Sequence, residues 1–130
     1  MIVRKVLNIE DLPTKHVAVR RALERCGVPT IEHADNAVDG LDMIEAAIAE
    51  GKPYHAIVTD MYFPISKGGM EAQAGMYVIE ELQARGIDVP IIVCSSARMV
   101  IPEIVGCIHY SSRNDLDADM REVIEQIRTM

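Results

Sequence analysis

Tryptophan is absent from this 130-residue chain, and phenylalanine occurs once, at Phe63. A core with so few aromatic rings must be filled with aliphatic side chains, and hydrophobic residues make up 49% of the sequence. The length supports one well-filled core and is too short for two. We therefore expect a single domain spanning residues 1–130.

An excess of positive charge is also absent, since the net charge is −7. Binding to a nucleic acid backbone needs clustered lysine and arginine, so a nucleic acid partner is not expected. Arginines gather only within 20–25, where Glu24 interrupts them. This grouping indicates the solvated face of a helix.

Long hydrophobic runs are missing as well. The first eleven residues, MIVRKVLNIED, lack the apolar stretch of a signal peptide or a membrane span. Cys26, Cys94 and Cys107 are odd in number and far apart, which favours buried thiols in a reducing compartment over a disulfide framework. A cytoplasmic protein without a membrane partner is the resulting expectation.

What the chain does contain is a regular alternation of short apolar runs and helical stripes. The stripes repeat at three- and four-residue spacing, which is typical of amphipathic helices, and this order predicts βαβ units with helices on both faces of a parallel sheet. Strands are predicted at 6–9, 30–34, 55–59, 91–94 and 105–110, and helical stripes at 19–26, 37–48, 79–82 and 116–127.

Two segments depart from this alternation. Residues 61–75 are long for a connection between a strand and a helix, and loops of this length tend to be functional or mobile. Residues 97–104 leave room for only one or two helical turns, and Pro102 limits even those. We predict an extended loop after the third strand and a shortened fourth helix.

Acidic side chains stand at the predicted ends of two strands. Glu10 and Asp11 follow the first strand, and Asp60 follows the third. Ligands bind beyond the carboxyl ends of parallel strands, and carboxylates that meet there repel one another unless a cation intervenes. Mg²⁺ suits such ligands, and an aspartate beside it can act as a nucleophile that forms an acyl phosphate. The structural alternatives are a turn-capping role for Asp60 and a helix-capping role for Glu10 or Asp11.

Three stretches of the chain, VLNIED with Pro13, HAIVTDMYFP and PIIVCSS, together resemble the receiver domains of two-component response regulators, of the chemotaxis-regulator kind. The resemblance covers essentially the whole chain. It implies a flavodoxin-like, doubly wound α/β fold with a five-stranded parallel sheet in the order 2-1-3-4-5. It also implies a phosphoprotein of a two-component system or phosphorelay.

The resemblance assigns a role to each strand-end residue. It implies that Asp60 is the phosphoacceptor and that Glu10, Asp11 and Asp60 bind Mg²⁺, together with the backbone carbonyl of Tyr62. No other cofactor is implied. Ser95 matches the residue whose hydroxyl hydrogen-bonds the phosphoryl group, and its loop moves on activation.

The end of the fifth strand both matches and departs from the family. Tyr110 matches an aromatic switch residue, although a packing role is equally open. The family places a lysine shortly afterwards, where this chain has Arg113, and arginine is not equivalent to lysine. Either Arg113 replaces that lysine at the phosphoryl group or it points to solvent. Lys67, in the extended loop, is a second candidate for the missing cation, the alternative being a mobile surface loop.

These observations predict a phosphorylation switch rather than an enzyme with a separate substrate, catalysing at most its own phosphorylation and dephosphorylation. A sensor histidine kinase or phosphotransfer protein would supply the phosphoryl group, and a downstream protein would bind the altered surface. The shortened fourth helix changes the usual output face, so the mode of partner binding or homodimer formation should differ. The alternative is a pseudo-receiver, an interaction module that works without phosphorylation.

Overall fold

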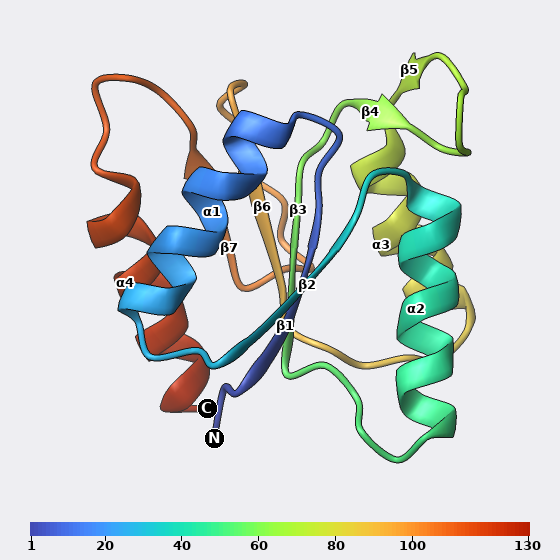
Figure 1. The fold of residues 1–130 in the computed structure, drawn as a ribbon, viewed down its shortest axis with the longest axis horizontal. Coiled ribbons are helices and arrows are strands. Elements are labelled where there is room, and N and C mark those ends of the chain that lie inside the picture. Colours follow the sequence, from blue (N-terminus) through green and yellow to red (C-terminus); the bar gives the residue numbers. More distant parts are fainter.

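The computed structural model describes residues 1–130 and contains one five-stranded parallel sheet with helices on both faces (Figure 1). Its strand order is β2-β1-β3-β6-β7, which is the predicted order 2-1-3-4-5 of the main-sheet strands. The predicted doubly wound fold class is therefore confirmed. The strands are β1 (Lys5–Ile9), β2 (Thr30–Ala34), β3 (Ala56–Thr59), β6 (Ile91–Ser95) and β7 (Gly106–His109).

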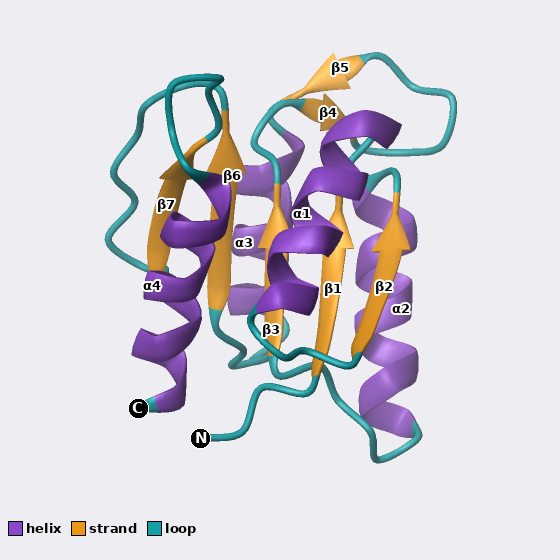
Figure 2. Ribbon diagram, turned by 60° about the vertical axis from the view of Figure 1, so that its left-hand side comes forward, coloured by secondary structure: helices purple, strands orange, loops and turns teal.

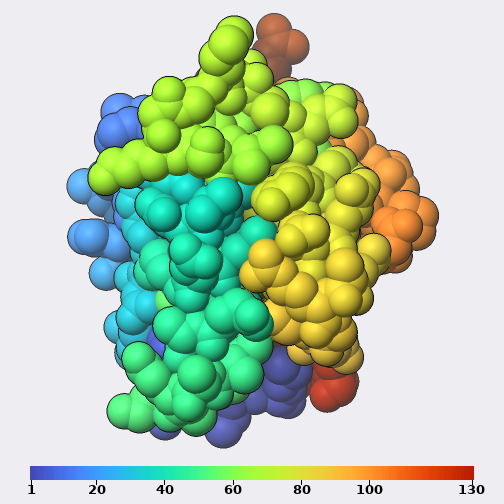
Figure 3. All heavy atoms as spheres, turned by 90° about the vertical axis from the view of Figure 1, so that its right-hand side faces the viewer, coloured from blue at the N-terminus to red at the C-terminus, as the bar shows by residue number.

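Four helices cover the sheet in two pairs (Figure 2). One face carries α1 and α4, and the other carries α2 and α3, which lie side by side on the surface seen in Figure 3. None of the four is both long and apolar enough to cross a bilayer. The helices are α1 (Pro13–Arg25), α2 (Ala37–Ala49), α3 (Ala74–Ala84) and α4 (Leu116–Arg128).

The core is divided by the sheet into two apolar layers, because successive side chains of a strand point to opposite faces. In β1, Leu7 and Ile9 pack in the layer beneath α2 and α3, whereas Val6 packs in the layer beneath α1 and α4. All three are fully buried. The near-continuous apolar strands of the sequence are thus explained by coverage of both faces.

The extended loop after β3 contains an antiparallel hairpin that the sequence pattern did not predict. Its two strands, β4 (Phe63–Pro64) and β5 (Glu71–Ala72), lie above the carboxyl ends of the main strands (Figure 2). Phe63 is fully buried and anchors the hairpin, while the Val38 N–H of α2 donates to the Ile65 carbonyl at 2.8 Å. The loop is therefore ordered structure attached to the body of the domain.

The segment between β6 and β7 departs further from a helix than the sequence indicated. Residues 96–105 form bends and turns instead of the one or two helical turns expected. Pro102 cannot donate a backbone hydrogen bond, and the segment is too short to close regular turns on both sides of it. Met99, Ile101 and Ile104 nevertheless pack against the apolar layer of α2 and α3, so this irregular segment covers part of the core.

Gly75 allows the start of α3 to approach the backbone that follows β3. A Cβ atom at this position would lie 2.4 Å from the Asp60 carbonyl oxygen and 2.8 Å from the Met61 Cα. The Gly75 N–H also donates to the Met61 carbonyl at 3.0 Å. Only glycine permits this contact, which fixes the backbone immediately after Asp60.

We expect Gly75→Ala to lower the free energy of unfolding by about 1–3 kcal/mol, the usual cost of overpacking. Gly106→Ala is the matched control, since its Cβ would meet nothing closer than 3.4 Å. Urea denaturation followed by circular dichroism measures both variants. Equal losses in the two variants would contradict the close packing described for Gly75.

Candidate phosphoacceptor and metal site

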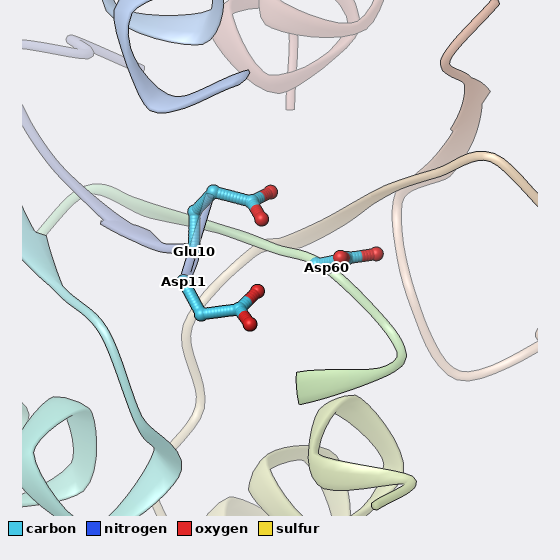
Figure 4. A group of neighbouring side chains, drawn as sticks. All are labelled: Glu10, Asp11 and Asp60. Carbon is cyan, nitrogen blue, oxygen red and sulfur yellow. The ribbon is translucent and has the colours of Figure 1, made fainter. Parts of the chain in front are cut away.

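Three carboxylates meet at the carboxyl-terminal edge of the sheet. Glu10 and Asp11 follow β1, Asp60 follows β3, and the two strands are neighbours in the sheet. One oxygen from each carboxylate lies within 4.8 Å of the other two. Figure 4 shows the Glu10 and Asp11 carboxyl groups extending to the side on which Asp60 lies. The three acidic residues singled out from the sequence are thus brought together.

Burial makes this cluster costly unless a cation is present. Glu10 is 1% exposed and Asp60 is 8% exposed, whereas Asp11 is half-buried. Like charges at this separation disfavour one another's ionised form, and burial adds to the cost of each buried charge. The site therefore requires positive charge from within the protein or from a bound ion.

The protein supplies that charge from Lys15, in the first turn of α1. The Lys15 ammonium is almost completely buried, lying 3.0 Å from Glu10 Oε1 and 3.2 Å from Asp60 Oδ1. It donates a hydrogen bond to the Cys94 carbonyl of β6 at 2.7 Å. It also lies 5.2 Å from the centroid of the Tyr110 ring. Lys15 thus links the ends of three neighbouring strands.

The burial of Lys15 has a signal in the sequence, which lies in a helix and not at the strand ends. The helical stripe recognised at Val19, Ala22 and Leu23 extends one turn towards the N-terminus, where position 15 falls on the same face. A lysine in a buried stripe needs a nearby anion, because an unpaired buried charge is very unfavourable. Glu10 and Asp60 are the anions that this position required.

Opposing effects set the protonation of this cluster. Burial raises the pKa of Glu10 to about 7, with the Asp60 charge acting in the same direction and Lys15 against it. For Lys15, burial alone would lower the pKa, but the charges of Glu10 and Asp60 raise it above its usual value. Lys15 therefore stays protonated at neutral pH and serves as the fixed counter-ion of the cluster.

The Asp60 side chain is oriented by its own backbone neighbourhood. The Met61 N–H donates to Asp60 Oδ1 at 2.7 Å, and the Asp60 N–H donates to the Ile9 carbonyl at 3.1 Å. The Lys15 ammonium also pairs with Oδ1, so this oxygen receives both the Met61 hydrogen bond and the Lys15 contact. A carboxylate held in this way keeps one orientation at the sheet edge, as a positioned nucleophile requires.

A pair of stacked histidines fixes the backbone that carries Glu10. The rings of His16 and His33 lie 3.8 Å apart and nearly parallel. His16 Nδ1 donates to Asn8 Oδ1 at 2.7 Å, and His33 Nε2 donates to the Glu10 backbone carbonyl at 2.6 Å. Asn8 is itself buried and donates to the Val58 carbonyl. This polar network, which the sequence did not reveal, ties α1 and β2 to the end of β1.

Glu10 also contacts the start of α1, as the helix-capping alternative suggested. Its Oε2 accepts a hydrogen bond from the Leu12 N–H at 3.3 Å. Leu12 is the N-cap residue of α1, and its apolar side chain makes no capping hydrogen bond. Glu10 therefore combines a structural contact at the helix start with its place in the acidic cluster.

The expected switch residues lie at the ends of β6 and β7. Ser95 is the last residue of β6 and is buried, and its Oγ accepts a hydrogen bond from the Ala97 N–H at 3.2 Å. The Tyr110 N–H donates to the Ser95 carbonyl at 2.7 Å, which couples the two strand ends. Tyr62, two positions after Asp60, is 41% exposed.

Neither of the two basic residues proposed from the sequence forms an ion pair with Asp60. Arg113 is exposed, and its backbone N–H donates to Ser111 Oγ. Lys67 is exposed on the hairpin loop, where it lines a polar hollow together with Asp11. Lys15 is the only basic side chain within ion-pair distance of Asp60.

No protein-family model matches the chain, and no curated protein sequence does so. Solved structures of low identity do match. A DNA-binding response regulator of the LuxR family from Staphylococcus aureus is 16% identical with a TM-score of 0.72, the alignment covering 95% of this chain and 98% of that one. A CheY-like receiver domain from Methylobacillus flagellatus is 14% identical with a TM-score of 0.70, covering 97% and 99%.

The response regulator TrrA from Thermotoga maritima, solved in complex with Mg²⁺ and BeF, is 17% identical with a TM-score of 0.72. That alignment covers 95% of this chain and 98% of TrrA. At these identities the likeness establishes the fold. The chain has the fold of response regulator receiver domains, as the sequence resemblance implied.

The histidine stack predicts a pH dependence of stability. Burial, followed by the His33 and Arg20 charges, lowers the pKa of His16 below its usual 6.5. Below about pH 6.5 the unfolded chain binds a proton that folded His16 resists, so the contribution of His16 to the free energy of unfolding falls as the pH falls. Glu10, whose pKa burial raises to about 7, contributes in the opposite direction over the same range. Above that pH both states are neutral at His16, and this contribution to the pH dependence disappears.

Thermal unfolding measured between pH 7.5 and pH 5 tests this expectation through the difference between His16→Gln and the native chain, in which the Glu10 contribution cancels. We expect His16→Gln to gain stability relative to the native chain as the pH falls, because it has lost the His16 contribution. His109→Gln, which leaves the stack intact, serves as the control and should show no such gain. A difference between His16→Gln and the native chain that does not change with pH would contradict the role given to His16.

Proposed function

We propose that this protein is a phosphoacceptor receiver domain of a two-component signalling system, phosphorylated on Asp60. The observation that carries the proposal is the convergence of Glu10, Asp11 and Asp60 within 4.8 Å at the sheet edge of a receiver-type fold. The fold alone would not support it, since one fold hosts many functions.

The donor set fits Mg²⁺. Three carboxylates offer the hard oxygen ligands that this ion prefers, and half-buried Asp11 leaves one side of the cluster open to water. Glu10, Asp11 and Asp60 would hold the ion, with the backbone carbonyl of Tyr62 as a further ligand. When bound, the ion would neutralise negative charge on the transferred group.

The chemistry assigned to Asp60 is a direct phosphoryl transfer. A carboxylate oxygen of Asp60 forms a bond to the phosphorus of the donor, and the bond from phosphorus to the leaving group breaks. The leaving group keeps that electron pair; a donor histidine would then take up a proton at its nitrogen. Asp60 has little exposure and a fixed orientation, which suits a nucleophile approached from one side.

Ser95 and Tyr110 are proposed to transmit the modification. A phosphoryl group adds about −1.5 to −2 charges and new hydrogen-bond acceptors, which can draw the Ser95 hydroxyl away from Ala97. Because the Tyr110 N–H is bonded to the Ser95 carbonyl, a shift at the end of β6 would reach the end of β7. The surface around β7 would then bind a different partner, or bind the same one more tightly.

The partners proposed are a sensor histidine kinase or a phosphotransfer protein as donor, and a protein target as receiver of the signal. Residues 96–105 form bends and turns beside β7, in place of a helix. An output surface built from this segment would present different side chains from those of a helical one. We therefore propose a partner-binding or homodimer mode that differs from the family's usual modes.

The direct test is incubation of the protein with Mg²⁺ and a small phosphodonor such as acetyl phosphate, followed by intact mass spectrometry. We expect the native chain to gain the mass of one phosphoryl group and Asp60→Asn to gain none. Asp88→Asn, an exposed aspartate preceding β6, is the control and should be modified like the native chain. The absence of any mass gain in the native chain, with several donors and metals, would favour the phosphorylation-independent pseudo-receiver.

The metal site has a separate test. We expect Asp11→Asn to weaken Mg²⁺ binding by roughly tenfold or more, because it removes one of the charged ligands that offset the ion's dehydration. Isothermal titration calorimetry measures the affinity, with Asp88→Asn again as control. Equal Mg²⁺ affinity in both variants would place the ion elsewhere.

A further inference from the structure

The buried ammonium of Lys15 has no role in the function proposed so far. Its neighbours are the Asp60 and Glu10 carboxylates and the Cys94 carbonyl, and it is the one lysine among the buried residues. We infer that Lys15 is the cation that contacts the phosphoryl group carried by Asp60. This inference rests on the proposed function and assigns to α1 a charge that other receivers draw from the end of their last strand.

The position of the Lys15 ammonium supports this inference. The Lys15 ammonium lies 3.2 Å from Asp60 Oδ1, so a group bonded to either oxygen of that carboxylate comes next to it. The hydrogen bond to the Cys94 carbonyl holds the ammonium at the sheet edge, between the ends of β3 and β6. Lys15 can therefore contact a phosphoryl oxygen without a rearrangement of the helix that carries it.

The burial of the Lys15 side chain also supports it. The Lys15 side chain is 5% exposed, so its charge is poorly screened and acts strongly on any negative charge that develops beside Asp60. A lysine ammonium binds phosphate as a compact point charge. Arg113 and Lys67 are both exposed and make no ion pair with Asp60.

Lys15 has a second carboxylate partner besides Asp60. In the free protein Lys15 also neutralises Glu10, at 3.0 Å. A divalent ion at the acidic cluster would give Glu10 another counter-charge and would leave Lys15 free to contact the phosphoryl group. Lys15 should therefore oppose metal binding while promoting phosphoryl transfer, which separates its proposed role from a structural one.

The test compares Lys15→Met with Arg21→Met, which removes an exposed positive charge from the same helix. The rate of phosphoryl uptake from acetyl phosphate with saturating Mg²⁺ is followed by intact mass spectrometry. We expect Lys15→Met to be slower than the native chain by at least about tenfold, as is common when one donor to a developing charge is removed. Arg21→Met, Arg113→Met and Lys67→Met should keep the native rate.

A second readout is the Mg²⁺ affinity, measured by isothermal titration calorimetry on the same variants. Lys15→Met should bind Mg²⁺ as tightly as the native chain or more tightly, because a competing ammonium is gone. Lys15→Arg, which retains the charge, should recover part of the transfer rate. A loss of both Mg²⁺ affinity and transfer rate in Lys15→Met would indicate a merely structural residue and overturn the inference.

A third measurement uses the native protein, so it does not depend on the folding of any variant. The side-chain NMR signals of Lys15 should shift when beryllofluoride and Mg²⁺ are added, by more than those of the exposed Lys52 and Lys67.

Native transfer rates in Lys15→Met, or slowing in Arg113→Met or Lys67→Met alone, would overturn the role of Lys15 and leave Asp60 phosphorylation standing. A native chain that is never phosphorylated would overturn both proposals.

Discussion

The ion pairs of Lys15 with Glu10 and Asp60 are the interaction on which the site depends. Two nearly buried carboxylates at this separation are unfavourable without a counter-charge, and the Lys15 ammonium provides one at 3.0 Å from Glu10 and 3.2 Å from Asp60. Removing one partner from a buried ion pair typically costs roughly 3–5 kcal/mol, because the remaining charge is left uncompensated. Lys15 therefore holds the two carboxylates together from within the protein.

The rest of the fold places these three side chains. The pairing of β1 with β3 brings Glu10 beside Asp60, and the short turn into α1 brings Lys15 over both. The histidine stack holds the end of β1, while Gly75 holds the backbone after Asp60 against α3. Each of these contacts restrains the backbone and takes no part in the proposed chemistry. A rigid scaffold positions functional groups at strand ends in this way.

The sequence predicted the sheet and the acidic residues well, for a physical reason. Strands that are buried on both faces appear in the sequence as apolar runs. The residues that follow such strands must lie at one edge of a parallel sheet. Glu10, Asp11 and Asp60 could therefore be grouped before the structure was known. Lys15 was not predicted at the site because it interrupts an apolar helical stripe, whereas the family resemblance directs attention to the end of the last strand.

Two other features of the fold could not be predicted from the hydrophobic pattern of the sequence. The hairpin within residues 61–73 rests on two-residue strands and on the burial of Phe63, and neither leaves a periodic signal. Between β6 and β7, Pro102 correctly indicated a disrupted helix, but the sequence pattern did not show that no helical turn forms or that Met99, Ile101 and Ile104 pack onto the core. These tertiary contacts of both segments leave no periodic pattern in the sequence.

The most direct test of the central claim is a crystal structure of the protein with Mg²⁺ and beryllofluoride, which mimics a phosphoryl group on aspartate. We expect the adduct on Asp60, the ion among Glu10, Asp11 and Asp60, and the Lys15 ammonium within hydrogen-bond distance of a fluorine. An adduct on Asp60 contacted by Arg113 or Lys67, with Lys15 still paired only to carboxylates, would contradict the role given to Lys15. The absence of any adduct on Asp60 would contradict the phosphoacceptor itself.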